Sequence, residues 1–201
     1  FAQPKIIMEG GSVEFNGAGT VLTSRSCLLN ANRNPHLNQG QIEQYLIDYY
    51  GVDQVLWVSD GIVGDDTDGH IDDTVRFVNS DTVIAMVEPK KSDDNHAVLA
   101  KNLSELSQMR LISGKQLNIV ELPMPDPVII DEFRAPGSYA NFYISNAGVL
   151  VPTFDCPQDE IALNLLGQLF TDRPVIGLSA KKIIWGQGSF HCLTQQEPQG
   201  N

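Results

Sequence analysis

Apolar and polar residues follow the same order three times along this 201-residue chain. Each copy opens with two short runs rich in β-branched residues, continues with a segment whose apolar residues recur every three or four positions, and closes with another β-rich run. This order predicts two strands, a helix and a third strand, which together make a ββαβ unit. The copies begin near residues 9, 68 and 138, and a fourth copy without a helix begins near residue 188.

The first copy illustrates the pattern. VEF and TVLTS are joined by a loop with Asn-Gly at 16–17, and this pair between alternating residues is a strong hairpin signal. QVLWVS, which starts at residue 54, is predicted to be the closing strand. The helix between them is predicted to end at Gly51. Its apolar spacing comes from Ile42, Tyr45, Leu46 and Tyr49.

The second and third copies repeat these elements. TVRFV and TVIAMV predict a hairpin, residues 97–110 a helix, and LNIVELP a strand. The third copy has strands in NFYIS, GVLVPTF and VIGLSA, and Asp155 is expected to cap the helix between the last two. That helix is expected to bury Ile161, Leu165, Leu166 and Leu169. IIWGQGSFHCLTQ is expected to start the fourth copy as a strand.

Repeated ββαβ units favour an α+β fold in which the units pack around a shared axis, an α/β propeller, over a doubly wound sheet. A generic α+β domain stays open as the alternative. The length predicts about one domain. Because Phe1 stands close to the first predicted strand and the last unit lacks its helix, we expect the chain to be part of a longer domain.

Composition narrows the function classes. The chain has 13 Lys and Arg against 25 Asp and Glu, a net charge of −12, and so lacks the basic clusters that nucleic-acid binding needs. No apolar run approaches the roughly 20 residues of a membrane span. Three cysteines without a CxxC pair are typical of a reducing compartment. These features favour a cytoplasmic globular protein, and a cationic small molecule is a suitable partner for its acidic surface.

The densest polar cluster is GDDTDGHIDD at 64–73, in which five carboxylates surround His70. If the run leads straight into the strand TVRFV, His70 and Asp72 point to the same face. A carboxylate beside an imidazole orients it and raises its pKa, as general acid–base catalysis requires. An acidic turn with a solvated histidine is the alternative. Whether Asp66 and Asp68 contact substrate or only shape the turn stays open.

The same run raises the question of a metal site. Aligning Gly69 with the sixth position of a calcium loop places Gly64 and Val75 at the first and twelfth positions, where ligands are needed, so an EF-hand is excluded. A divalent-metal hydrolase built on residues 65–73 stays open. It would be inhibited by a chelator, whereas a thiol enzyme would be inhibited by iodoacetamide.

The cysteines differ in their surroundings. Cys192 lies in GQGSFHCLT, where glycines allow close backbone approach. Neighbouring strand residues face opposite ways, so the partner expected for Cys192 is His70 and not the adjacent His191. Cys156, near a predicted helix N-terminus, is the rival nucleophile. Cys27 is expected to be a small core residue.

Four other positions need an interpretation, and two of them have an alternative. Glu9 precedes two glycines, and it is either part of a plain turn or a carboxylate presented where another group approaches closely. Arg33 is either a structural ion-pair partner or a solvated side chain. Trp57 and Trp185 lie in apolar segments and are expected in the core.

Taken together, four segments resemble the agmatine deiminase family, which also includes the bacterial-type peptidylarginine deiminases. The segments are EGGS at 9–12, CLLNANRNP at 27–35, GDDTDGHIDD at 64–73 and GSFHCLTQQEP at 188–198. The resemblance spans nearly the whole chain in the family's order. It implies the pentein fold, five ββαβ units around a pseudo-fivefold axis, of which three units and part of a fourth would be present.

The resemblance also implies site roles. Cys192 matches the nucleophile that forms an amidino-thioether, and His70 matches the acid–base histidine. Asp72 matches the carboxylate that holds the substrate guanidinium, and Glu9 the glutamate that pairs with the histidine or the guanidinium. With agmatine, such a hydrolase would yield N-carbamoylputrescine and ammonia, a step toward putrescine and other polyamines. No metal and no organic cofactor is implied.

One departure concerns the clamp on the substrate. The family has a further guanidinium-binding aspartate in an Arg-Asp-x-Gly-Pro type motif ahead of EGG, and the chain has no such segment. Residues 1–201 are therefore expected to be the C-terminal portion of a single catalytic domain. We expect the isolated chain to be inactive and an added upstream segment to restore turnover. Deiminase activity of the 201-residue chain alone would contradict this expectation.

Three functions stay in view. A deiminase acting on agmatine is favoured, and the same chemistry on peptidylarginine or another guanidino compound is the nearest alternative. A catalytically silent pentein that serves as a binding module is disfavoured because Cys192, His70, Asp72 and Glu9 are all present. A homodimer and a secreted protein stay open.

Overall fold

Each of the three complete sequence copies folds into the ββαβ unit that its pattern predicts, within residues 4–197, which the computed structural model describes. The first unit consists of β1 (Val13–Phe15), β2 (Thr20–Ser24), α2 (Gln39–Tyr50) and β3 (Gln54–Val58). The second consists of β4 (Val75–Phe77), β5 (Thr82–Val87), α3 (Asn95–Gln108) and β6 (Asn118–Pro123). The third consists of β9 (Tyr143–Ile144), β10 (Val149–Thr153), α4 (Gln158–Leu169) and β11 (Val175–Ser179).

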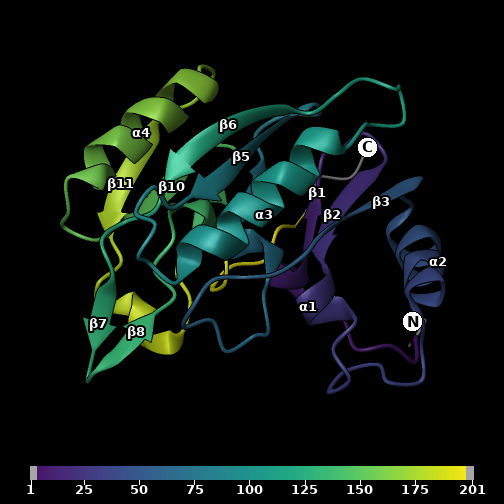
Figure 1. Ribbon diagram of the computed structural model, residues 1–201. Helices are drawn as coiled ribbons and strands as arrows, with labels where there is room; N and C mark the ends of the chain where they lie inside the picture. The colour runs from purple at the N-terminus through teal and green to yellow at the C-terminus, as the bar shows by residue number, and fades with distance from the viewer. Residues whose placement is uncertain (1–3, 198–201) are drawn as a thin grey trace.

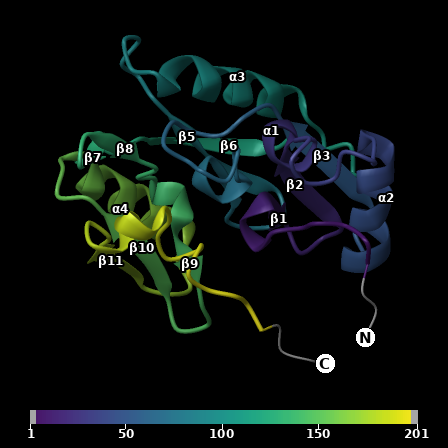
Figure 2. The same ribbon diagram turned by 90° about the horizontal axis from the view of Figure 1, so that it is seen from below.

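The three units share one topology. In each, the first two strands form an antiparallel hairpin and the third strand lies parallel to the second. Parallel neighbours need a crossover, which the helix supplies. Figure 1 shows α3 across β5 and β6, and α4 beside β10 and β11. Figure 2 shows the units following one another in an arc, with α2 and α3 on its outer side.

Strand β5 shows how neighbouring units share a core. Val83 and Ala85 pack in one cluster with Leu22 of the first unit, whereas Ile84 and Met86 pack in another cluster with the third unit. Successive strand residues point to opposite faces, so both faces of β5 are buried. This explains why TVIAMV is a continuous apolar run and not an alternating one.

The predicted helices are confirmed, but α2 and α4 bury narrower stripes than expected. Ile42 and Leu46 of α2 are buried, whereas Tyr49 is exposed. In α4, Leu166 is buried and Ile161 is 49% exposed. Each helix rests on a three-stranded sheet, which covers only part of its apolar face. None of the helices in residues 4–197 is long and apolar enough to cross a membrane.

A hairpin outside the units was not expected from the pattern. β7 (Val128–Ile130) and β8 (Phe133–Ala135) pair antiparallel between the second and third units. The two loop residues Asp131 and Glu132 have φ values of 46° and 72°. Such loops usually carry Asn-Gly or Gly-Gly, so a sequence without glycine here gives no hairpin signal. A one-turn helix, α1 (Arg25–Leu28), also follows β2.

The expected cap of α4 is wrong. The helix begins at Gln158, and Asp155 is exposed with a φ of 60°. The carboxylate of Asp159 instead accepts hydrogen bonds from the backbone N–H groups of Phe154 (3.0 Å) and Asp155 (2.9 Å). The acidic side chain that organises this turn therefore lies inside the helix and not before it.

The strand expected at the start of the fourth copy is also wrong within the described residues. Its first part is a 3₁₀ helix, Ile183–Gly186, and the part around Cys192 is a turn in which Leu193 N–H donates to Ser189 O. No strand forms between residues 183 and 197. Trp185 is 61% exposed and is not a core residue, whereas Trp57 is buried as expected.

A short 3₁₀ helix precedes the first strand of every unit. These helices are Gly10–Ser12, Ile71–Asp73 and Tyr139–Asn141. The second contacts both of the others. Gly11, Asp73 and Asn141 each stand two residues before the first strand of their unit. The repeat therefore brings three equivalent turns to one place.

Arg76 fixes the units relative to one another. Its buried guanidinium donates to Glu14 of the first unit at 2.8 Å and to the carbonyl oxygens of Ala140 and Phe142 at 2.8 Å each. Glu14 also accepts from the backbone N–H of Phe77 at 2.8 Å. Since both charges are buried and hydrogen-bonded, loss of one partner leaves the other uncompensated.

We predict that Arg76→Met destabilises the protein by about 3–5 kcal/mol, because it leaves Glu14 as an unpaired buried charge. Adding Glu14→Gln in the same chain should recover part of this loss. Urea unfolding measures both effects. Lys115→Met, which removes an exposed ion pair with Asp81, is the control and should leave the midpoint nearly unchanged. Equal midpoints for Arg76→Met and the control would refute the role of Arg76.

Candidate active site

A cavity of about 350 Å³ opens where the 3₁₀ turns meet the C-terminal segment. Its lining includes Gly10, Gly11, Asp66, His70, Gln187, His191 and Cys192. Two of the four residues expected to carry chemistry, His70 and Cys192, line the cavity directly. The other two, Glu9 and Asp72, contact His70 from either side. The structure therefore brings all four candidates together.

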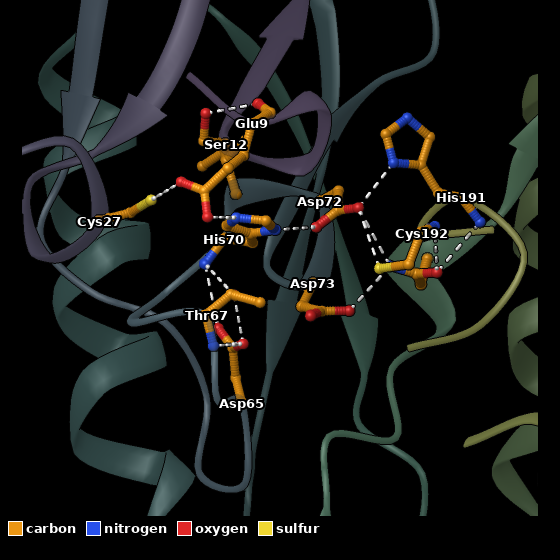
Figure 3. A network of polar contacts seen from close by, with 12 residues as sticks. Glu9, Ser12, Cys27, Asp65, Thr67, His70, Asp72, Asp73, His191 and Cys192 are labelled. Atoms are coloured by element: carbon orange, nitrogen blue, oxygen red, sulfur yellow. Dashed lines mark hydrogen bonds and ion pairs between the residues drawn. The ribbon is translucent and has the colours of Figure 1, made fainter. Parts of the chain in front are cut away.

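His70 lies between two carboxylates (Figure 3). Its Nε2 is 3.5 Å from Glu9 Oε1, and its Nδ1 is 3.9 Å from Asp72 Oδ1. The expected alternation of His70 and Asp72 along a strand is wrong, because residues 71–73 form a 3₁₀ helix. The two side chains still meet, since His70 precedes this helix and Asp72 lies within it. A side chain at Gly11 would overlap the His70 ring and the Asp72 carboxylate, so glycine is required there.

Asp72 is completely buried at the centre of the site. Its Oδ2 contacts His191 Nδ1 at 2.6 Å and Cys192 Sγ at 3.4 Å. Its Oδ1 and His70 Nε2 are buried atoms without a hydrogen-bond partner among the described residues. A buried carboxylate oxygen left unpaired is costly, so this atom is ready to accept a donor from a ligand.

The sulfur of Cys192 lies among negative charges. Cys192 as a residue is exposed, but its Sγ is directed at Asp72 and at the side-chain amide of Asn141, 3.0 Å away. Desolvation of the sulfur, and then the charges of Asp72 and Asp73, raise the pKa of the Cys192 thiol. Burial and the charge of Asp72 also raise the pKa of Asp73 well above its usual range. The resting site therefore favours a protonated thiol.

His191 is a site residue that the sequence argument discarded. The expectation that it faces away from Cys192 assumed a strand, but the segment is a turn, in which consecutive side chains diverge by much less than 180°. His191 and Cys192 consequently reach the same oxygen of Asp72. Gly188 allows this turn, since a Cβ there would lie 2.8 Å from the Cys192 sulfur.

Arg33 holds Glu9 in place. Its guanidinium donates to Glu9 at 2.5 and 2.9 Å, to Asp68 at 2.8 Å and to the carbonyl oxygen of Thr67 at 2.6 Å. Burial opposes ionisation of Glu9, but the hydrogen bonds and charge of Arg33 outweigh it and lower the Glu9 pKa. Arg33 is thus the structural ion-pair partner, and Glu9 is a carboxylate presented to His70.

Most of the acidic run forms an internal loop and not a metal site. Asp65 accepts hydrogen bonds from the backbone N–H groups of Thr67 (2.8 Å), Gly69 (2.9 Å) and His70 (3.0 Å). Asp68 accepts hydrogen bonds from the side chains of Asn32 and Arg33, which lower its pKa. Asp66 is exposed and lines the cavity. Asp68 therefore shapes the turn, while Asp66 is free to face a ligand.

Two groups of side chains have the spacing of metal ligands, namely Glu9, Cys27 and His70, and Asp72, Asp73 and Cys192. In the first, Arg33 already binds Glu9, and burial raises the pKa of Cys27 to about 12. In the second, the amide N–H group of Asn141 points at all three residues. An N–H donor between these three ligand atoms disfavours a cation there. We therefore assign no metal centre to either group.

Cys156, the rival nucleophile, lies in a different environment. Its Sγ contacts the hydroxyl group of Tyr139 at 3.2 Å and Asp159 at 3.6 Å. It packs against the core shared by the second and third units. None of its contacts involves the Glu9–His70–Asp72 group, so it lacks the acid–base partner that Cys192 has nearby. Cys27 is fully buried, as expected.

Comparison with known proteins gives one consistent result. The chain matches the family described as Porphyromonas-type peptidyl-arginine deiminase over residues 1–198. It is 36% identical to an agmatine deiminase of Pseudomonas syringae pv. tomato, over 98% of this chain and 59% of that protein. The chain spans 56–59% of the length of the curated relatives that it matches.

Solved structures of similar proteins confirm the fold. An agmatine deiminase of Enterococcus faecalis is 33% identical with a TM-score of 0.92, over 96% of this chain and 58% of that one. A C. jejuni agmatine deiminase with substrate bound is 37% identical with a TM-score of 0.88, over 94% of this chain and 55% of that one. The expected pentein-like α+β fold of repeated ββαβ units, here as a partial propeller, is thereby confirmed.

We predict that alkylation of Cys192 by iodoacetamide keeps accelerating above about pH 9, because the raised thiol pKa leaves little thiolate at neutral pH. Asp72→Asn removes the nearest charge and should move the rate profile to lower pH. Asp172→Asn, an exposed carboxylate, is the control. Intact mass against time gives the rates. A wild-type plateau below about pH 8 would contradict the prediction.

Proposed function

The chain belongs to the Porphyromonas-type peptidyl-arginine deiminase family, and on that basis we propose that the protein containing it deiminates a guanidino substrate, agmatine. The products are N-carbamoylputrescine and ammonia, which makes the reaction a step toward putrescine. Residues 1–201 form the C-terminal portion of one catalytic domain in this proposal. The length of the matched relatives, of which the chain spans 56–59%, supports that assignment.

One observation carries the proposal. A fully buried carboxylate with an unpaired oxygen lies 3.4 Å from a cysteine sulfur. A guanidinium is a planar cation with several N–H donors, so it can pair with Asp72 and place its central carbon against Cys192. A neutral ligand would leave the negative charges around the sulfur uncompensated.

The substrate itself activates the nucleophile. In the resting site, desolvation and the charges of Asp72 and Asp73 raise the pKa of Cys192. A bound guanidinium adds a positive charge next to the sulfur, which offsets these carboxylates and favours the thiolate. The reactive form of Cys192 then arises when substrate is present.

His70 moves the protons. The thiolate of Cys192 adds to the guanidinium carbon, and the tetrahedral adduct expels ammonia, which takes a proton from His70. The remaining amidino-thioether is attacked by water, whose proton returns to His70. The hydroxyl group of this adduct loses its second proton to solvent as the C–S bond breaks, which frees the ureido product and the thiolate. Glu9, 3.5 Å from His70 Nε2, orients the imidazole.

Asp66 favours agmatine over peptidylarginine. It is an exposed carboxylate on the lining of the cavity and is not used by the Arg33 network. The second end of agmatine is an ammonium group, whereas the corresponding end of peptidylarginine is uncharged backbone. The three cysteines are unpaired, which agrees with a cytoplasmic location. Peptidylarginine, or a binding role without catalysis, is the alternative that the experiment separates.

We predict that haloacetamidine, a guanidinium-like alkylating agent, adds once to the full-length protein. Intact mass measures the addition. Cys192→Ala should abolish labelling because the nucleophile is gone, and Cys156→Ala, the matched cysteine control, should keep it. Agmatine should protect Cys192 at lower concentration than N-acetylarginine amide. Labelling that follows Cys156 would refute the assigned nucleophile, and protection without ammonia release would indicate a binding module.

A further inference from the structure

Asn141 occupies a position in the site that the deimination chemistry above does not use. It is 1% exposed and lies in the 3₁₀ helix Tyr139–Asn141. Arg76 fixes this turn by binding the carbonyl oxygens on both sides of Asn141, those of Ala140 and Phe142. The Asn141 side chain is therefore presented to the Cys192 turn from a rigid support.

The side-chain oxygen of Asn141 accepts several hydrogen bonds from the turn that carries Cys192. Its Oδ1 accepts hydrogen bonds from the N–H groups of Ser189 (3.1 Å), His191 (3.0 Å) and Cys192 (3.2 Å). The hydroxyl group of Ser189 donates to it as well, at 3.0 Å. Four donors around one atom also settle the orientation of the amide, because an NH₂ group there would face only donors.

The nitrogen of the same amide faces only acceptors. Asn141 Nδ2 lies 3.0 Å from Cys192 Sγ, 3.2 Å from Asp72 Oδ2 and 3.0 Å from Asp73 Oδ1. An amide nitrogen has two hydrogens, so three acceptors share two donors. Among the described residues, two side chains contact the Cys192 sulfur through polar atoms. Asn141 offers an N–H donor, whereas Asp72 offers a carboxylate oxygen.

We propose that Asn141 is a positioning residue that holds the Cys192 turn with its oxygen and stabilises the Cys192 thiolate with its nitrogen. The inference rests on the deiminase function proposed above. When a guanidinium binds Asp72, the carboxylate gains other donors, and the Asn141 N–H group is released to the sulfur. Through Asn141, binding of a guanidinium to Asp72 thereby favours the thiolate form of Cys192. The hydrogen bond from Asn141 indeed acts to lower the Cys192 pKa against the carboxylates.

Asn141→Asp tests the nitrogen separately from the oxygen. The variant keeps an oxygen for the three backbone N–H groups but replaces the donor to sulfur by an acceptor. We expect iodoacetamide to alkylate Cys192 about tenfold more slowly at pH 8, with the pH profile displaced upward by about one unit. Because this reagent does not need the guanidinium site, the outcome is independent of whether agmatine is the substrate.

Asn102→Asp is the matched control. Asn102 is also buried, and its Oδ1 accepts from the N–H groups of Ser59 (3.1 Å) and Asp60 (3.3 Å), but it has no contact with the Cys192 site. It should leave the alkylation profile unchanged whatever its effect on the melting temperature. If Asn141→Asp melts cooperatively and keeps the wild-type profile, Asn141 serves only the loop and the proposal is overturned.

A second measurement covers the case in which Asn141→Asp does not fold. In the wild-type full-length protein labelled with ¹⁵N-asparagine, the side-chain amide resonance of Asn141 should titrate together with the Cys192 thiol. The same resonance should stay constant over that pH range in Cys192→Ala. A purely structural amide would give the same signal in both proteins, and that result would overturn the proposal. Failure of haloacetamidine to label the wild type would instead refute the deiminase function.

Discussion

The buried guanidinium of Arg76 is the contact on which the arrangement of the three units depends. It joins Glu14 of the first unit to the turn that precedes β9 in the third, while Arg76 itself stands in β4 of the second. Each unit alone is a small sheet with one helix, and the apolar attraction between units is not directional. The guanidinium of Arg76 has fixed donor directions. A displacement of one unit would therefore leave a buried ion without its partners. The same contact sets the turn that carries Asn141.

The site follows from the repeat. The 3₁₀ turn before each first strand contributes to one centre: the first presents Glu9 and the close approach of Gly11, the second Asp72 and Asp73, and the third Asn141. The C-terminal turn adds Cys192 from outside the three units. Equivalent positions of a repeat thus carry different chemistry, and they meet because the units lie side by side in an arc (Figure 2).

The site around Cys192 has an excess of carboxylates when no ligand is bound. Asp72 and Asp73 hold the Cys192 thiol protonated, and an oxygen of Asp72 is left unpaired. The unpaired oxygen costs free energy, whereas the protonated thiol is the favoured state. In the proposed function a bound guanidinium supplies donors to that oxygen and a positive charge that favours the thiolate. In the function proposed above, Cys192 becomes reactive only when a guanidinium binds, which limits side reactions of the cysteine.

The sequence by itself determined the strands, the helices and the family, because these depend on local periodicity and on motifs whose residues are close in the chain. It also named Cys192, His70, Asp72 and Glu9 as candidate site residues, and the structure brings these four together. It did not find the β7–β8 hairpin, whose turn has no glycine, or the exposure of Trp185. Only the tertiary structure decided that His191 shares Asp72 with Cys192 and that Asn141 contacts the sulfur, 51 residues away in the chain. Such contacts depend on how whole units pack, and no local pattern encodes them.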